Sequence, residues 1–396
     1  MTSKKAEPGS GQESGAARLL RLGMVGGGRD AFIGGVHRIA ARLDGQYELV
    51  AGALSSDPER ARASALDLRI APDRAYDSFE VMARTERTRT DRIDVVAIVA
   101  PNHVHHAAAR AFLQAGFHVI CDKPLTRTME EAEDLAAIVE RSGKLFVLTH
   151  NYTGYPMVRQ AREMVAAGEL GAVRVVQVEY AQDWLTTSLE QTGQKQAGWR
   201  TDPARSGAGC VGDIGTHAFN LAEFVTGLSC EEVAAELATF VFGRQLDDNV
   251  QMLLRFSGGA RGGLWASQVA PGNENALRLR VFGERGGLEW AQEHPNQLRL
   301  SPFGRPVSII SRGGSGAGPA AAHATRIPAG HPEGYLEGFA QIYRDAAELI
   351  RAAEEGRAPD PACTLVPGIA DGLRGMRFVA ASIASGRANA AWTRLV

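Results

Sequence analysis

Residues 19–34 read LLRLGMVGGGRDAFIG, where a short apolar run meets three successive glycines and then a stretch of helical character. A strand, a glycine-rich turn and a helix in this order are typical of the phosphate-binding turn of a dinucleotide fold. Gly26 and Gly28 would allow a tight turn, and the helix start would offer free N–H groups to a pyrophosphate. Gly34 comes six residues after Gly28 rather than three, so the motif alone also fits a turn without a ligand.

Short apolar runs alternate with amphipathic stretches from residue 19 to residue 150. The run IDVVAIV at 93–99 is rich in β-branched residues, which is typical of a strand buried on both faces. Strands that alternate with helices predict a doubly wound parallel sheet, so we expect a Rossmann dinucleotide-binding domain over 19–150. The predicted strands are 19–25, 47–54, 93–99, 118–121 and 145–149, and the predicted helices are 36–43, 58–67, 107–115 and 129–142.

The pattern changes after residue 150, where turn signals separate runs that alternate between apolar and polar residues. We expect an α+β domain for substrate binding and oligomerisation over 151–396, with a large, mostly antiparallel open sheet. A free apolar face of such a sheet usually marks an interface, which predicts a homodimer or homotetramer joined through 236–300. The predicted strands are 173–180, 236–242, 249–256, 262–270, 277–283, 286–291 and 297–300, the helices are 157–167, 335–353 and 368–385, and 302–330 is an extended loop.

Composition and charge argue against several classes of protein. Hydrophobic residues make up 44% and charged residues 22% of the chain, and the net charge is −2, so no nucleic-acid or membrane partner is indicated. The four cysteines lack CxxC spacing, which predicts no metal site, no disulfide framework and a cytoplasmic location. Residues 1–18 are small and polar, which predicts a disordered tail.

The end of the second predicted strand bears on the choice of cofactor. In dinucleotide folds an acidic residue at this position holds the ribose and repels a 2′-phosphate. This chain has Ser55 and Ser56 there, and the nearest acid, Asp57, is expected to cap the next helix. No arginine stands beside the two serines to bind a phosphate. The sequence therefore predicts NAD as the cofactor and leaves NADP open.

Three further motifs stand at intervals along the chain: APNHVH at 100–105, DKP at 122–124 and GDIGTH at 212–217. Together with the glycine turn, these motifs resemble the Gfo/Idh/MocA family of sugar and inositol oxidoreductases over about residues 19 to 385. Two positions depart from the family pattern. Asp122 stands where the family usually has glutamate, and Asn220 stands where the Asp-x-Gly-x-His-x-x-Asp motif ends in an acid.

The resemblance implies which residues carry the chemistry. Oxidation of a secondary alcohol needs a group that takes the hydroxyl proton. In the family the histidine of the last motif usually acts as the acid/base and the lysine hydrogen-bonds the same hydroxyl, which assigns these roles to His217 and Lys123. Asp213, four residues before His217, would orient the substrate or tune the imidazole.

The remaining predicted site residues surround this catalytic group. His103, His105 and His106 have no acid or cysteine spaced to join them as metal ligands, so His105 is interpreted as a cofactor-edge residue. The predicted cofactor-binding residues are Gly26, Gly27, Gly28, Phe32, Ile33, Ser55, Ser56, Pro101, Asn102, His105, Asp122, Lys123, Trp199 and Arg200. The predicted substrate-binding residues are Lys123, Asn151, Tyr152, Arg200, Asp213, His217 and Asn220.

These observations predict an NAD(P)-dependent oxidoreductase that transfers a hydride between nicotinamide and a secondary hydroxyl of a small-molecule sugar or cyclitol. One alternative shares the fold. It is an oxidoreductive glycoside hydrolase with tightly bound NAD, which oxidises a ring carbon transiently, eliminates the glycosidic bond and restores the alcohol. Tyr152, Tyr155 or Tyr180 would then serve as an extra base. A second alternative is a non-catalytic nucleotide-sensing protein, which the presence of both Lys123 and His217 disfavours.

Overall fold

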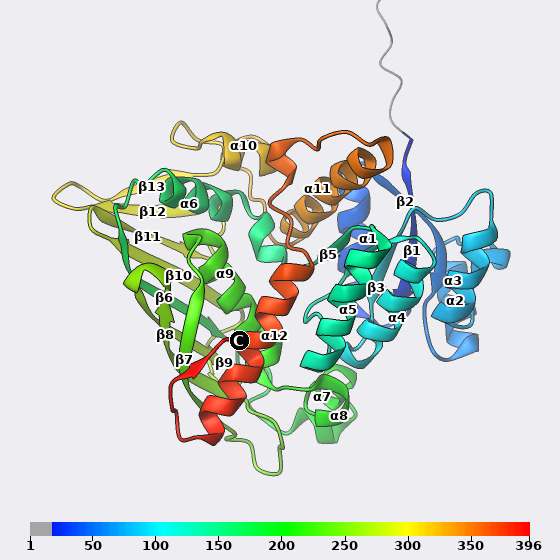
Figure 1. Cartoon of the computed structure of the whole chain (residues 1–396), viewed down its shortest axis with the longest axis horizontal. Helices are drawn as coiled ribbons and strands as arrows, with labels where there is room; N and C mark the ends of the chain where they lie inside the picture. The colour runs from blue at the N-terminus through cyan, green and yellow to red at the C-terminus, as the bar shows by residue number, and fades with distance from the viewer. Residues whose placement is uncertain (1–17) are drawn as a thin grey trace, which may run out of the picture.

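The structure is a computed structural model that describes residues 18–396, and it contains two sheets with helices packed around them (Figure 1). This architecture confirms the predicted fold class, a parallel doubly wound sheet followed by an α+β half with a large, mostly antiparallel sheet. Residues 1–17, most of the predicted tail, lie outside the described residues. Arg18, assigned to that tail from the sequence, pairs with Asp94 at 2.8 Å.

The first sheet is parallel throughout, in the order β2-β1-β3-β4-β5. Its register pairs Gly26 with Val99 and Ile98 with Cys121, so the segments that follow β1, β3 and β4 meet at one edge. The strands are β1 Leu20–Gly26, β2 Tyr47–Ala53, β3 Val95–Val99, β4 His118–Cys121 and β5 Phe146–Leu148. The helices are α1 Phe32–Leu43, α2 Pro58–Asp67, α3 Phe79–Thr88, α4 Asn102–Gln114 and α5 Met129–Ser142.

Three helices of this half differ from the prediction. Helix α4 begins at Asn102, five residues before the predicted start. Helix α1 begins at Phe32, four residues before the predicted start, because Gly34 and Gly35 weaken the helical signal. Helix α3 was not predicted, because its sequence is largely polar and does not indicate that Glu86 is buried. The carboxylate of Glu86 is fully buried and accepts hydrogen bonds from Arg74 and Tyr76, which lie outside the helix.

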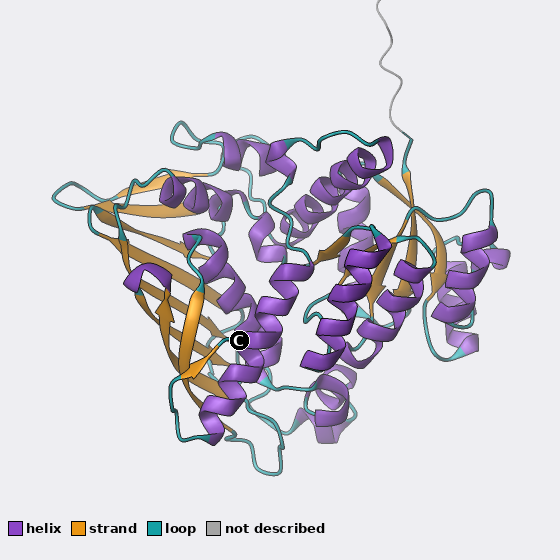
Figure 2. Cartoon of the chain, in the orientation of Figure 1, coloured by secondary structure: helices purple, strands orange, loops and turns teal. Residues whose placement is uncertain are grey.

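The second sheet has nine strands in the order β13-β12-β11-β10-β6-β9-β8-β7-β14, and only β6 and β9 pair in parallel. Helices fill the space between the two sheets (Figure 2). Val175, Leu253 and Phe282 are exposed on the opposite side of the strands. The strands are β6 Val173–Ala181, β7 Cys230–Ala238, β8 Asn249–Phe256, β9 Arg261–Ser267, β10 Ala276–Gly283, β11 Gly286–Ala291, β12 Gln297–Pro302, β13 Ser308–Ser311 and β14 Thr393–Arg394.

Two predictions for this half were wrong. The predicted loop 302–330 contains strand β13, which pairs with β12 through Leu298 and Ile310, and helix α10, Pro319–Ala324. The predicted strand 236–242 is instead the end of β7, which stops at Ala238. The strand ends there because the side chain of Asp248 accepts the backbone N–H groups of the next apolar residues, Phe240 and Val241.

Helices from the end of the chain connect the two sheets. Helix α11 packs on α1, where the hydroxyl of Tyr47 donates to the carbonyl oxygen of Tyr343 at 2.8 Å. Helix α12 lies between α5 and β7 (Figure 1). Within residues 18–396, no helix has the length and apolar character that a membrane crossing requires. The remaining helices are α6 Pro156–Ala166, α7 Lys195–Arg200, α8 Pro203–Ser206, α9 Thr216–Thr226, α11 Tyr335–Glu355 and α12 Ile369–Arg387.

Candidate active site

The glycine turn presents backbone at the carboxyl end of β1. Gly26 and Gly27 have φ angles of 74° and 68°, which glycine adopts without strain. A Cβ atom on Gly28 would lie 2.7 Å from the carbonyl oxygen of Leu54, and one on Gly34 would collide with the backbone of Gly27. The displaced Gly34 therefore has the role of the third glycine in dinucleotide turns, which is to let the helix pack closely.

A cleft of about 770 Å³ opens at this edge of the first sheet and adjoins a pocket of about 580 Å³. The predicted residues that line the cleft are Gly26, Gly27, Gly28, Ile33, Ser55, Ser56, Pro101, Asn102, Asp122, Lys123, Trp199, Arg200 and Asp213. The predicted residues that line the pocket are Phe32, Ile33, Asp122, Lys123, Asn151, Tyr152, Arg200, Asp213 and His217. Lys123, Arg200 and Asp213 line both, so they lie at the boundary between cleft and pocket.

Lys123 connects the two halves of the chain at this boundary. Its Nζ donates to the backbone oxygen of Asp213 at 2.6 Å and to Oδ1 of the same residue at 2.8 Å. Asp213 lies in a single π-helical turn, Val211–Gly215, a feature that is frequent at functional sites. The Asp122 carboxylate accepts the backbone N–H of Lys123 at 2.9 Å and the hydroxyl of Thr149 at 3.0 Å. The lysine is therefore held from both sides.

The Asp213 carboxylate is engaged at both oxygens. Besides Lys123, it accepts hydrogen bonds at Oδ2 from Nε of Arg200 at 3.2 Å and from Nε2 of Gln268 at 2.8 Å. Burial alone would raise the pKa of Asp213, but Lys123 and Arg200 outweigh burial and hold this pKa well below its usual value. Asp213 is therefore a carboxylate that positions cations, not a group that exchanges protons near neutral pH.

His217 lies in the first turn of α9 and its side chain reaches the pocket. Its Nδ1 is buried and has no hydrogen-bond partner among residues 18–396, which leaves Nε2 for a substrate. The ring centroids of Tyr152 and His150 lie 5.0 Å and 5.5 Å from that of His217. Burial, reinforced by the positive charge of Lys123, lowers the pKa of His217 well below 6.5, so the imidazole is neutral at neutral pH.

Tyrosine and amide groups form the far wall of the pocket. The hydroxyls of Tyr152 and Tyr180 lie 2.6 Å apart, and Tyr180 donates to Oδ1 of Asn275 at 2.7 Å. Nε2 of Gln182 donates to the same oxygen at 2.8 Å. Sequence reasoning assigned Tyr152 to substrate binding, but not Tyr180, Gln182 or Asn275. Among the pocket residues that it did not name are Gln182, Trp184, Gln194, Gln196, Asn275, Gln292, Tyr335 and Phe339.

Two predicted site residues line neither the cleft nor the pocket. His105 is buried, with Nδ1 2.8 Å from the carbonyl oxygen of Pro124 and Nε2 2.8 Å from that of Ala100. Its interpretation as a cofactor-edge residue is corrected, because it supports the two segments that carry Pro101 and Lys123. Asn220 is buried within α9 and is also absent from both linings.

Comparison with known proteins places this geometry in a family. The model of an oxidoreductase family with an NAD-binding Rossmann fold, GFO_IDH_MocA, matches residues 20–150, and the model of the GFO/IDH/MocA C-terminal domain matches residues 158–289. The chain is 32% identical to YfiI, an uncharacterised oxidoreductase of Bacillus subtilis, over 95% of this chain and 97% of that protein.

Two solved structures are similar along nearly the whole chain. An oxidoreductase from Sinorhizobium meliloti is 56% identical, with a TM-score of 0.87 over 95% of this chain and 99% of that one. An inositol dehydrogenase homolog from Azotobacter vinelandii, complexed with NAD⁺, is 37% identical, with a TM-score of 0.91 over 96% and 98% of the two chains.

The cleft runs from the serines after β2, past the glycine turn, to Lys123 after β4, which is the layout that a dinucleotide requires. Fold, cleft and relatives together define an NAD-dependent oxidoreductase of the dehydrogenase class. The chain belongs to the Gfo/Idh/MocA family, as its motifs predicted. The hypothesis of a non-catalytic nucleotide-sensing protein is therefore set aside.

Proposed function

We propose that the enzyme transfers a hydride between NAD and a secondary hydroxyl of an uncharged sugar or cyclitol. The observation that supports this most is that Lys123 and Asp213 meet at the boundary of cleft and pocket while His217 lines the same pocket. The phenol and amide groups of the pocket wall suit hydroxyl groups, which both donate and accept hydrogen bonds. The Azotobacter homolog was also solved with NADH and myo-inositol, so cyclitols are the first class to test.

In this proposal His217, Lys123 and Asp213 each have one role. Bound nicotinamide supplies the hydride acceptor or donor. His217, neutral and open to the pocket at Nε2, takes the hydroxyl proton during oxidation. The ammonium of Lys123 stabilises negative charge that develops on the same oxygen. Asp213, held by Arg200 and Gln268, fixes the position of Lys123.

A screen of the purified enzyme against cyclitols, sugars and glycosides tests the proposal, with NADH absorbance and sugar release followed in parallel. We expect NADH to accumulate with a free cyclitol or sugar. Cleavage of a glycoside without NADH accumulation would instead support the oxidoreductive glycoside hydrolase. Burial raises the pKa of Tyr152 and Tyr180 above that of a free phenol, which makes both poor bases for the elimination step of that alternative.

Ser55, which follows β2, leads to a prediction about cofactor preference. Ser55 lines the cleft together with Arg60, which the sequence did not point to and which pairs with Asp30. Ser55→Asp is expected to raise the NAD/NADP ratio of kcat/KM by about tenfold or more, because a carboxylate there repels the 2′-phosphate. Ser55→Ala is the control and should change the ratio little. An unaltered ratio in Ser55→Asp would mean that the ribose contacts lie elsewhere.

We also propose that copies of the chain associate through the free face of the nine-stranded sheet, as a homodimer or homotetramer. Leu253 in β8, between β9 and β7, is 61% exposed on this face. Leu253→Lys is expected to lower the mass measured by light scattering at micromolar concentration, because it places a charge inside the interface. Leu66→Lys on α2 is the control, since Leu66 is also strongly exposed, at 77%, but belongs to the first half of the chain. A wild-type monomer would contradict the proposal.

The cytoplasm is the location that we propose for the enzyme. All four cysteines are buried free thiols. Free thiols persist in the reducing cytoplasm, whereas oxidising compartments favour disulfides. Recovery of the native enzyme in the cytoplasmic fraction of its source cell is the expected result, and recovery in a secreted fraction would contradict it.

A further inference from the structure

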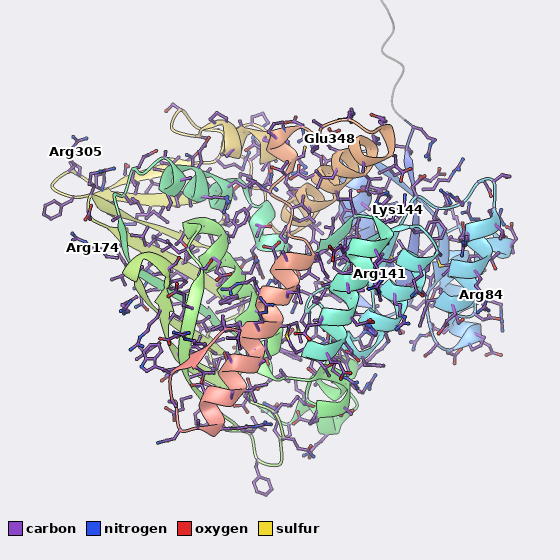
Figure 3. The ribbon with its side chains drawn as sticks, in the orientation of Figure 1. Arg84, Arg141, Lys144, Arg174, Arg305 and Glu348 are labelled. Atoms are coloured by element: carbon purple, nitrogen blue, oxygen red, sulfur yellow. The ribbon has the colours of Figure 1, made fainter. Side chains whose placement is uncertain are left out.

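Away from the cleft, a nitrogen, an oxygen and a sulfur from three different elements lie close together. They belong to His323 in α10, Asp345 in the middle of α11 and Cys363 in the short turn Pro361–Cys363. All three ligand atoms lie within 4.8 Å of one another. Nε2 of His323 is 2.8 Å from Oδ1 of Asp345 and 3.8 Å from Sγ of Cys363. Figure 3 marks this part of α11 with Glu348, three residues beyond Asp345.

We propose that His323, Asp345 and Cys363 form a binding site for a transition-metal ion, with Zn²⁺ as the preferred ion. Imidazole and thiolate ligands favour Zn²⁺ and Co²⁺ over Mg²⁺ and Ca²⁺, which take oxygen ligands. Tetrahedral Zn²⁺ with bonds of about 2.0–2.3 Å separates its ligand atoms by about 3.3–3.7 Å. The two measured distances lie on either side of this range, so shifts of less than about 1 Å would complete the site.

The surroundings of Asp345 fix the direction of its carboxylate. Arg159 donates to Oδ2 at 2.6 Å and Gln341 donates to Oδ1 at 2.7 Å, and all three side chains are buried. Contacts of this kind orient carboxylate ligands in metal sites. An ion would bind at the lone pair of Oδ1 that His323 now uses, so neither contact needs to break.

The charges and protons of this step balance. The carboxylate of Asp345 and the thiolate of Cys363 offset the two charges of the ion, while Arg159 leaves the site with one net positive charge. Binding releases the thiol proton to solvent, and His323 binds the ion through the lone pair of Nε2, which requires any remaining ring proton to sit on Nδ1. His323 is the most exposed of the three ligands, at 15% of its side chain, so water has access to the fourth coordination position.

An ion at this site would stabilise the position of α11, a helix that also contributes to the active site. Helix α11 begins at Tyr335, which lines the substrate pocket, and carries Asp345 ten residues later, about 15 Å along the axis. Through its ligands the ion would link α11 to α10 and to the turn at Cys363. We therefore expect it to stabilise the fold without taking part in hydride transfer. The sequence did not indicate the site, because its three ligands are each about twenty residues apart along the chain and form no short motif.

Titration of the metal-free protein with Co²⁺ tests the site, because a Co²⁺–thiolate bond gives a near-ultraviolet charge-transfer band and tetrahedral Co²⁺ absorbs in the visible. We expect both features to saturate at one ion per chain and to disappear when Zn²⁺ displaces Co²⁺. Zn²⁺ at about 100 times its dissociation constant should raise the melting temperature by about 3–5 °C.

Two ligand variants and one matched control complete the experiment. Cys363→Ser should abolish the charge-transfer band, and His323→Gln should weaken Co²⁺ binding at least tenfold, while circular dichroism checks that each variant folds. Cys230→Ser is the control, since Cys230 is another buried free thiol, in β7, and it should bind Co²⁺ like the wild type. Absence of the band in the wild type, or an unchanged band in Cys363→Ser, would show that the three side chains form only a hydrogen-bonded cluster.

Discussion

Replacement of His217 by alanine is expected to slow hydride transfer by about 10²–10⁴-fold, the usual loss for a positioned proton-transfer group. The side chain lines the substrate pocket and not the cofactor cleft, so the affinity for NAD should stay within about threefold of the wild type. Single-turnover formation of NADH measures the chemical step, and calorimetry measures NAD binding. His217→Gln should be nearly as slow as His217→Ala, because an amide forms hydrogen bonds but does not accept the proton.

The pH dependence of the same step distinguishes a base from a residue that only binds substrate. Because burial and Lys123 lower the pKa of His217, the ring stays neutral from pH 8 to below 6.5. Titration of His217 should therefore not change the rate of oxidation over this range, and the rate should fall only as pH drops through the lowered pKa. Reduction of the ketone needs the protonated ring, so its rate should rise in that acidic range. If the pH profiles of His217→Ala showed the same changes in rate at acidic pH, the proton transfer would belong to another group.

Sequence patterning predicted the parts of the fold in which burial follows local periodicity. The run IDVVAIV predicted a strand between two layers, and β3 is buried at all five positions. The parts that were wrong or missed depend on partners outside the segment itself. Ile310 forms a strand because it pairs with Leu298, and α3 buries Glu86 because Arg74 and Tyr76 satisfy its carboxylate. Periodicity within one segment carries no information about such partners.

The candidate site divides in the same way. Sequence motifs pointed to Lys123, Asp213 and His217, and the structure places all three in the lining of one pocket, although their catalytic roles stay predictions. Gln182, Gln268 and Asn275 were not predicted. Each is adjacent to the end of a strand, and these ends become neighbours only through the sheet register, in which Ala181 pairs with both Ser267 and Ala276. The spacing of residues within a single segment therefore could not predict that these three side chains lie close together.

Lys123→Met is expected to lower kcat by about 10²–10³-fold, the usual loss when one group that stabilises a developing oxyanion is removed. Methionine has a similar length but carries no charge and no N–H donor. Asp213 would keep its contacts with Arg200 and Gln268, so the carboxylate should stay in place. Loss should therefore appear in kcat rather than in the stability of the fold, and thermal unfolding of the variant serves as the control.

The double variant tests whether Lys123 and His217 act on the same hydroxyl. If the two residues acted independently, their losses would multiply to about 10⁴–10⁷-fold. Residues that act on one oxygen and its proton lose less together, because removal of either one already disables much of the shared step. We therefore expect the double variant to be no more than about tenfold slower than the slower single variant. Fully multiplicative losses would separate the two residues into different steps and would contradict the proposed mechanism, even though both side chains line one pocket.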